Sequence, residues 1–155
     1  MAMARNAHVF ALGLLLVAPA SAGVAAAPAA CVPRFEHGWV RAAPPGATVL
    51  SGYGQLRNDC AAAVVLKGAR SAEFVMAQVH ETKVEKGIST MRHAKSSPLP
   101  ARATLRFEPN GRHLMLMHPR KALPVGTIVK LEFLLADGRR IPAELTVLRE
   151  APARK

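Results

Sequence analysis

The distribution of turn residues constrains the fold of this chain more than any other feature of its sequence. Beyond the N-terminal region, proline, glycine and Asn/Asp turn signals recur, and the segments between them alternate apolar and polar side chains. A recurrence of roughly 8–12 residues is typical of β-sandwiches and β-barrels. No segment carries an apolar period of 3.6 over the length of an extended helix. The pattern therefore predicts one all-β domain, a Greek-key β-sandwich of about seven to nine strands.

The predicted strands are short, and turn signals separate most of them. They are expected at residues 39–41, 52–58, 62–69, 74–84, 88–92, 104–107, 113–117, 127–135 and 140–148, with a loop at 96–100. Asp137-Gly138 joins the last two strands in the clearest hairpin signal, and Lys86-Gly87 predicts another hairpin turn.

The longest predicted strand, residues 74–84, shows how side chains should divide between two faces. Successive side chains of a strand point to opposite sides of the sheet. The predicted division places Val75, Ala77 and Val79 on one face, and on the other Phe74, Met76, Gln78 and His80.

The first residues predict export from the cytoplasm. Arg5 precedes a short apolar stretch at residues 9–18, and alanine-rich sequences follow at 20–22 and 25–27. This order is typical of a secretory signal peptide. We expect residues 1–27 to be removed, with cleavage near residue 22 or 27, leaving a domain at 28–150 and a frayed tail at 151–155. No later apolar run is long enough to cross a membrane. The sequence thus predicts a periplasmic protein without stable membrane insertion.

Two other interpretations of the N-terminal region are weaker. An uncleaved membrane anchor would need a longer apolar stretch than residues 9–18 provide. Lipidation at Cys31 would need an aliphatic residue upstream, which is absent, and Pro28 stands three residues before this cysteine.

The two cysteines, Cys31 and Cys60, are 29 positions apart. An oxidising compartment allows them to form a disulfide, which would stabilise the fold by about 3–4 kcal/mol through the closed loop. A redox-active or metal-binding thiol pair is the alternative. It is less favoured because the pair lacks the close Cys-x-x-Cys spacing.

Charge and composition exclude several function classes. The chain has 21 Lys and Arg against 10 Asp and Glu, so loss of Arg5 with the signal peptide leaves a net charge of +10. Aromatic residues are scarce, and export removes the chain from nucleic acid, so nucleic-acid binding is disfavoured. The sequence lacks a nucleophile elbow, a glycine-rich phosphate loop and a carboxylate pair at useful spacing, so we do not expect an enzyme. A basic module that docks on an acidic partner without metal stays open.

The segment at residues 113–117 carries the chemistry that points to a metal. Alternation places His113, Met115 and Met117 on one face, and Leu114 and Leu116 on the face suited to the core. Imidazole and thioether suit Cu(I), whereas hard cations prefer carboxylate oxygens. Because methionine fills core gaps more often than it ligates a metal, this strand does not establish a site by itself.

The spacing of histidine and methionine along the chain adds a family resemblance. Ten residues separate His80 from Met91, 21 separate Met91 from His113, and one separates His113 from Met115. This pattern resembles that of the periplasmic copper chaperones called PCuAC. The segments at residues 39–46 and 52–58 are also similar to the family, so the resemblance covers about residues 36–148.

The resemblance implies a cupredoxin-like β-sandwich that binds one Cu(I) near its surface through His80, Met91, His113 and Met115. It also implies delivery of copper to the dinuclear centre of cytochrome c oxidase subunit II, beside a thioredoxin-like partner of the Sco type. Copper sequestration or resistance at the same site is the alternative. We expect the chain to be a monomer.

Two further residues are candidate accessory ligands. His93 shares the face of Met91 in a strand, at a position where family members often carry methionine, and imidazole would also suit Cu(II). A solvated loop histidine is the alternative for His93. Met117 shares the face of Met115, with packing beneath the site as its alternative role. Since neither cysteine lies near this strand, we do not expect a blue-copper electron-transfer site.

Overall fold

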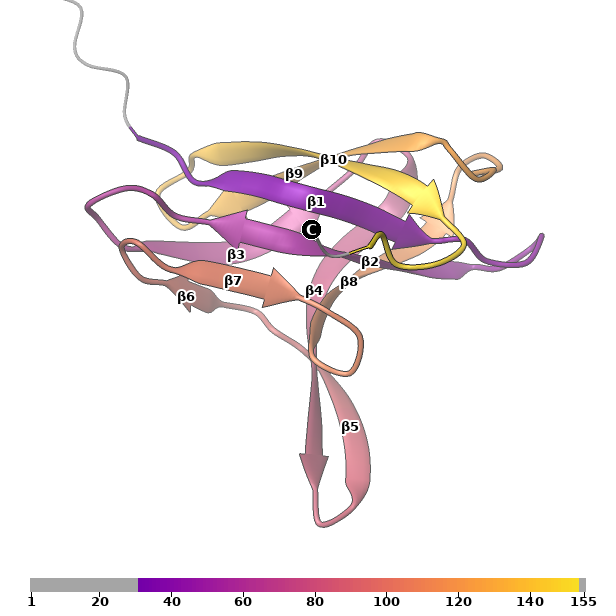
Figure 1. Ribbon diagram of the computed structural model, residues 1–155, viewed down its shortest axis with the longest axis horizontal. Coiled ribbons are helices and arrows are strands. Elements are labelled where there is room, and N and C mark those ends of the chain that lie inside the picture. Colours follow the sequence, from indigo (N-terminus) through magenta and orange to yellow (C-terminus); the bar gives the residue numbers. More distant parts are fainter. Residues whose placement is uncertain (1–30, 154–155) are drawn as a thin grey trace, which may run out of the picture.

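The structure is a computed structural model that describes residues 31–153. The predicted signal peptide and the last two residues of the predicted tail lie outside the described residues. Ten strands make up the described part of the chain, which contains no helix and hence none that could span a membrane. They are β1 (Arg34–Arg41), β2 (Val49–Arg57), β3 (Val64–Arg70), β4 (Phe74–Glu85), β5 (Ile88–His93), β6 (Ser97–Leu99), β7 (Thr104–Phe107), β8 (Arg112–Pro119), β9 (Ile128–Leu135) and β10 (Arg140–Leu148) (Figure 1).

Seven of these strands close into a sandwich around the core. The order β4-β8-β2-β1-β10-β9-β3 returns to β4 because Ala69 on β3 pairs with Ala77 on β4. All pairs are antiparallel except that of β1 and β10, where Trp39 lies opposite Thr146. The predicted fold class, an all-β domain with a cupredoxin-like sandwich, is confirmed.

The expected seven to nine strands are too few, because the segment predicted as a loop at 96–100 contains β6. This strand pairs with β3 at the end of the strand order, with Pro98 opposite Val65. Proline is tolerated there because an edge strand leaves one side of its backbone unpaired. Ser97 and Leu99 are both buried, so the segment is held by packing that a local turn pattern does not reveal.

The core consists of inward-facing side chains from every strand of the closed sandwich. On β9, Val129, Leu131, Phe133 and Leu135 alternate inward and are almost fully buried. The ring of Phe133 lies 4.9 Å from that of Phe35, measured between centroids. Each such buried side chain contributes about 1.5–3 kcal/mol relative to exposure.

The predicted division of side chains along β4 is wrong at its first residues. Phe74 is 1% exposed and faces the core, whereas Val75 is 56% exposed. From Ala77 onward the alternation holds. This end of β4 pairs with both β8 and β3, and sheets turn corners of this kind through local bends in a strand. Val75 and Met76 are both exposed, so strict alternation is interrupted here, and the packing of Phe74 in the core overrides the local pattern.

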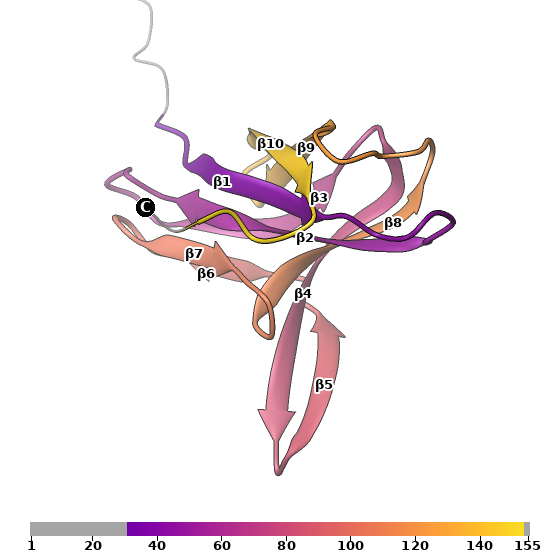
Figure 2. The same cartoon turned by 45° about the vertical axis from the view of Figure 1, so that its right-hand side comes forward.

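The outer parts of β4 and β5 project from the sandwich as a hairpin (Figures 1 and 2). Its tip is Lys86-Gly87, as predicted, with φ values of 51° and 78°. Positive φ at both central residues is what a tight type I′ hairpin turn requires. The hairpin begins where β4 leaves its partner β8, near His80 and Glu81.

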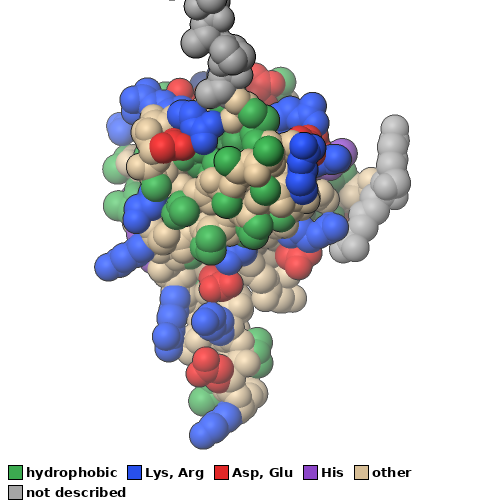
Figure 3. All heavy atoms as spheres, turned by 90° about the vertical axis from the view of Figure 1, so that its left-hand side faces the viewer, with side chains coloured by type: hydrophobic (Ala, Val, Ile, Leu, Met, Phe, Trp, Pro, Cys, Tyr) green, Lys and Arg blue, Asp and Glu red, His purple; other side chains and the backbone are tan. Residues whose placement is uncertain are grey.

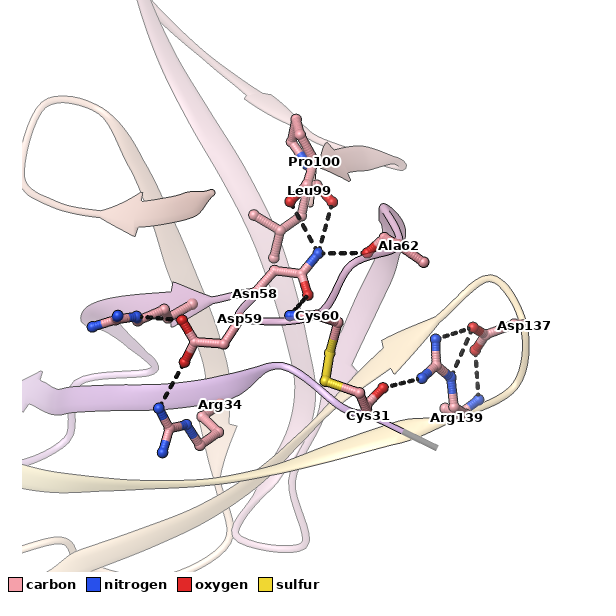
Figure 4. Close-up of a disulfide and its surroundings, with 11 residues drawn as sticks. Cys31, Arg34, Asn58, Asp59, Cys60, Ala62, Leu99, Pro100, Asp137 and Arg139 are labelled. Carbon is pink, nitrogen blue, oxygen red and sulfur yellow. Dashed lines mark hydrogen bonds and ion pairs between the residues drawn. A yellow bond between two sulfur atoms is a disulfide. The ribbon is translucent and has the colours of Figure 1, made fainter. Parts of the chain in front are cut away.

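A disulfide joins Cys31 to Cys60 and ties the segment before β1 to the turn after β2 (Figure 4). The neighbouring turn is organised by Asn58, which is fully buried. Its side-chain nitrogen donates to the carbonyl oxygens of Ala62 and Pro100, and its side-chain oxygen accepts from the Cys60 amide. Within the described residues no cysteine is free, so thiolate is not available as a metal ligand.

Candidate metal centre

Three neighbouring strands bring three histidines into one row. His80 on β4 lies directly opposite His93 on β5 and directly opposite His113 on β8. Residues opposite each other in antiparallel strands point to the same side of the sheet. The ring centroid of His80 is 5.6 Å from that of His93 and 6.1 Å from that of His113. The row therefore crosses the outer face of the sheet, at the base of the hairpin.

Met115 lies beside this row on β8. It follows His113 by two residues, and its partner on β4 is Gln78, which precedes His80 by two residues. Met115 is half-buried. Its thioether thus belongs to the same outer face, in the position next to both imidazoles.

Met91 lies on the other side of the row, on β5. Its partner on β4 is Thr82, and it precedes His93 by two residues. It is 55% exposed. Met91 and Met115 thus occupy diagonal positions on opposite sides of His80, and all four predicted ligands share one face. The shared face does not by itself establish that they bind a metal.

Hydrogen bonds to the imidazoles of His80 and His113 determine which ring nitrogen of each carries the lone pair. Nδ1 of His113 is 3.0 Å from the carbonyl oxygen of Gly111, which can only accept. His113 therefore carries its proton on Nδ1 and its lone pair on Nε2. Nε2 of His80 is 3.0 Å from the side-chain oxygen of Gln78, so its lone pair lies on Nδ1.

The Nδ1 atom of His80 is buried and has no hydrogen-bond partner among the described residues. Buried polar atoms are almost always paired, so an orphaned one calls for an explanation. A nitrogen lone pair held away from water, beside a second imidazole and a thioether, suits a metal ligand.

The protonation of His80 favours the same role. Burial lowers the pKa of His80 below its usual range, and the nearby imidazoles of His93 and His113 lower it further, because two positive charges would repel. His80 is therefore neutral near pH 7, with its lone pair free to ligate a cation.

The donor set decides which metal would fit. In the described part of the chain, no group of three or more His, Cys, Asp and Glu side chains converges into a candidate site. A complete coordination sphere at this row must therefore draw on the methionine thioethers. Two imidazoles and two thioethers make a soft set that suits Cu(I) better than zinc, calcium or magnesium.

Charged side chains lie on the opposite side of these strands. Glu81 faces Arg92 on β5 and Arg112 on β8, and the guanidinium of Arg112 donates to the Glu81 carboxylate at 3.2 Å. Alternation therefore leaves the imidazole face without a formal charge at these positions. Figure 3 shows lysine and arginine side chains along the projecting hairpin.

The sequence did not single out Met76 as a functional residue. The structure places it on β4 directly opposite Met117, with 46% of its surface exposed. The available signal was the alternation that put Met76 on the face of His80. Alternation within one strand could not reveal that Met117 on β8 is the partner of Met76, because it carries no information on strand pairing.

The cupredoxin-like sandwich of this chain is similar to solved structures of PCuAC domains. The chain is 28% identical to the structure described as CuI-DR1885 from Deinococcus radiodurans, with a TM-score of 0.62 over 86% of this chain and 87% of that one. The copper-bound PCuAC domain from PmoF2 is 25% identical, with a TM-score of 0.60 over 76% of this chain and 92% of that domain.

The chain belongs to the LpqE-like family. The family model described as "Putative lipoprotein LpqE-like" matches residues 34–147. A protein of Leifsonia xyli subsp. xyli (strain CTCB07), named "Putative lipoprotein Lxx21020", is 32% identical over 115 residues, which are 74% of this chain and 68% of that protein. In this chain the sulfur of Cys31 is engaged in the disulfide with Cys60.

Proposed function

We propose that this protein is an exported copper metallochaperone that binds one Cu(I) through His80, Met91, His113 and Met115. The observation that carries the proposal is the buried, unpartnered Nδ1 of His80 beside His113, with a thioether on either side. Similarity to structures described as copper-bound PCuAC and CuI-DR1885 supports the same ion.

The ligand types support delivery rather than permanent retention. Four neutral donors leave the charge of the bound ion uncompensated. Met91 is exposed on β5, which is an edge strand of the projecting hairpin. A partner could therefore replace this thioether first, and then take the ion by stepwise ligand exchange without any change in oxidation state.

The recipient that we propose is a periplasmic copper-accepting protein, either the dinuclear copper centre of oxidase subunit II or a Sco-type thioredoxin-like protein. The resemblance of the His80 to Met115 spacing to PCuAC chaperones supports this assignment. In this role the chain acts as a monomer after residues 1–27 are removed, and it catalyses no reaction. His93 is an accessory ligand that also serves Cu(II), whereas Met117 lies two residues beyond Met115 on β8 and is not one of the ligands of this site.

Anaerobic titration with Cu(I) against a chromophoric chelator tests the site. The wild type should bind one tight equivalent, and Met91→Ala/His113→Ala should weaken its affinity by roughly 100-fold or more, because two of four donors are lost. Ile88→Ala is the matched control, since Ile88 is exposed on β5 at a position that alternates away from Met91. Equal binding by all three proteins would overturn the proposal and favour the basic docking module.

A second assay separates delivery from sequestration. The loaded protein is mixed with purified oxidase subunit II or with a Sco-type protein, and copper is measured on each partner after separation. Transfer to either acceptor supports the chaperone role. Retention of the ion against both acceptors would favour sequestration at the same site.

A further inference from the structure

All four methionines of the described residues lie on one outer face. Two of them, Met91 and Met115, belong to the proposed copper site. The other two, Met76 and Met117, lie directly opposite each other on β4 and β8, one step further along the same strands. Leu114 and Leu116 supply the core-facing side of β8 and are fully buried. Packing against the core therefore does not account for the pair of Met76 and Met117.

The position of the pair suits coordination by sulfur. Opposite residues of an antiparallel pair have Cβ atoms about 4.5–5.5 Å apart, which brings both flexible thioethers within reach of one ion. The partner of Met117 on β2 is Val49, which is exposed and has no donor atom in its side chain. The position therefore offers soft sulfur ligands, which select Cu(I) over hard cations.

The pair also continues the line of the proposed copper site. Along β8, His113, Met115 and Met117 succeed one another on the outer face, and their partners on β4 are His80, Gln78 and Met76. Successive positions on one face of a strand are roughly 7 Å apart. Met115 thus stands between the imidazoles and the pair of Met76, which is exposed, and Met117, which is half-buried.

We propose that Met76 and Met117 form a second, weaker Cu(I) station through which the ion enters and leaves the site at His80 and His113. This inference rests on the proposed function, because it concerns the same ion. Two thioethers bind less tightly than two imidazoles with two thioethers. An ion on the pair can pass to Met115 by exchange of one thioether for another, and it remains Cu(I) throughout.

The test follows the methyl signals of methionine by NMR in protein labelled with ¹³C at the methionine methyl groups. Cu(I) is added anaerobically as its acetonitrile complex, and single Met→Leu variants assign the signals. The first equivalent should shift Met91 and Met115. Further Cu(I) should shift Met76 and Met117. The inference is overturned if the signals of Met76 and Met117 do not shift up to millimolar Cu(I). The spectra of the wild-type protein are sufficient for this test.

A double variant, Met76→Leu/Met117→Leu, provides the matched control. Leucine keeps the size and apolar character of methionine but removes the sulfur. The variant should retain the first equivalent and lose the weaker one. If the double variant still binds the weaker equivalent of Cu(I), that ion binds elsewhere, and the proposed site at Met76 and Met117 is contradicted.

The two proposals fail in different ways. If Met91 and Met115 do not shift while Met76 and Met117 do, the proposed four-ligand site is wrong and the methionine pair stands. The reverse result leaves the four-ligand site intact and removes the pair.

Discussion

The imidazoles of His80 and His113 lie directly opposite each other on β4 and β8, with ring centroids 6.1 Å apart. Only 33 positions separate them along the chain, yet three other strands, β5, β6 and β7, lie between β4 and β8 in sequence. The hydrogen bonds of Gln78 and Gly111 leave a lone pair on one nitrogen of each ring.

Gln78 should act as a positioning residue for His80. Its side-chain oxygen holds the proton on Nε2, which leaves Nδ1 as the ligating nitrogen. Partners of this kind typically change metal affinity by about 10- to 100-fold. We expect Gln78→Leu to weaken Cu(I) binding by roughly tenfold, measured by chelator competition. A ¹⁵N spectrum of the histidines should show a changed tautomer at His80, an effect that a merely structural role would not produce.

Thr82→Val is the control for this substitution, because Thr82 lies on the same face of β4 and is the partner of Met91. It should leave the tautomer of His80 unchanged. Unaltered affinity and tautomer in Gln78→Leu would show that Gln78 does not position the ring.

Copper binding should weaken in acid, because a proton and Cu(I) compete for the same imidazole lone pair. Burial and the neighbouring histidines lower the pKa of His80, so the ring resists protonation to a lower pH than a free imidazole does. Affinity should therefore hold as the pH falls towards about 6.5, the ordinary imidazole pKa, and decline below it. Chelator competition between pH 8 and pH 5 measures this profile, using a chelator calibrated at each pH.

The same lowered pKa has a consequence for folding without metal. The unfolded chain binds a proton at His80 more readily than the folded chain does, so acid favours unfolding. The contribution of His80 to the stability of the folded chain is present above the unfolded pKa and is lost as the pH falls through the unfolded and then the folded pKa.

For copper binding, a Cu(I) affinity that does not change with pH would contradict ligation by the histidines.

The disulfide should support stability without contributing to copper binding. It lies beyond the Arg57 end of β2, whereas β2 pairs with β8 near its other end, at Val49 to Gly52. We expect Cys31→Ala/Cys60→Ala to lower the free energy of unfolding by about 3–4 kcal/mol, measured by denaturant titration. The folded variant should still bind one Cu(I). If the variant remains folded but no longer binds Cu(I), the alternative hypothesis that Cys31 and Cys60 belong to a metal site would be favoured.

His93 should distinguish binding of Cu(II) from binding of Cu(I). It extends the row of imidazoles, with its ring centroid 5.6 Å from that of His80. Cu(II) favours nitrogen ligands, whereas thioether suits Cu(I). We expect His93→Met to weaken Cu(II) binding by roughly tenfold and to leave Cu(I) binding nearly unchanged, measured by competition for each ion separately.

Electron paramagnetic resonance of the Cu(II) form gives a second measure of this role, because loss of an imidazole reduces the nitrogen hyperfine pattern. His118→Asn is a control at an exposed histidine of β8, with an asparagine that tolerates its φ of 53°. Identical Cu(II) spectra in the wild type and His93→Met would leave His93 as a solvated residue.

Much of the fold could be predicted because its signals are local. The hairpin turns at Lys86-Gly87 and Asp137-Gly138 follow from their glycines, which adopt positive φ readily, and most strand positions follow from alternation between turns. The failures also have a physical cause. Ser97 and Leu99 form part of a strand because their segment pairs with β3 and is buried, and Phe74 faces inward because it packs into the core where β4 pairs with both β8 and β3. Both depend on contacts with distant segments.

The all-β class could be predicted from the amino-acid sequence, because turn propensity and alternation are properties of neighbouring residues. The four candidate ligands came from the resemblance of the His80 to Met115 spacing to PCuAC chaperones. Which strands are neighbours, and in what register they pair, depends on packing between segments that are distant in sequence. Burial of Ala77 and Val79 against the same core as Leu114 and Leu116 sets that register. A slip of one residue would turn every side chain of β8 to the other face. The pairing of His80 with His113, and of Met76 with Met117, exists only because the closed core forbids that slip.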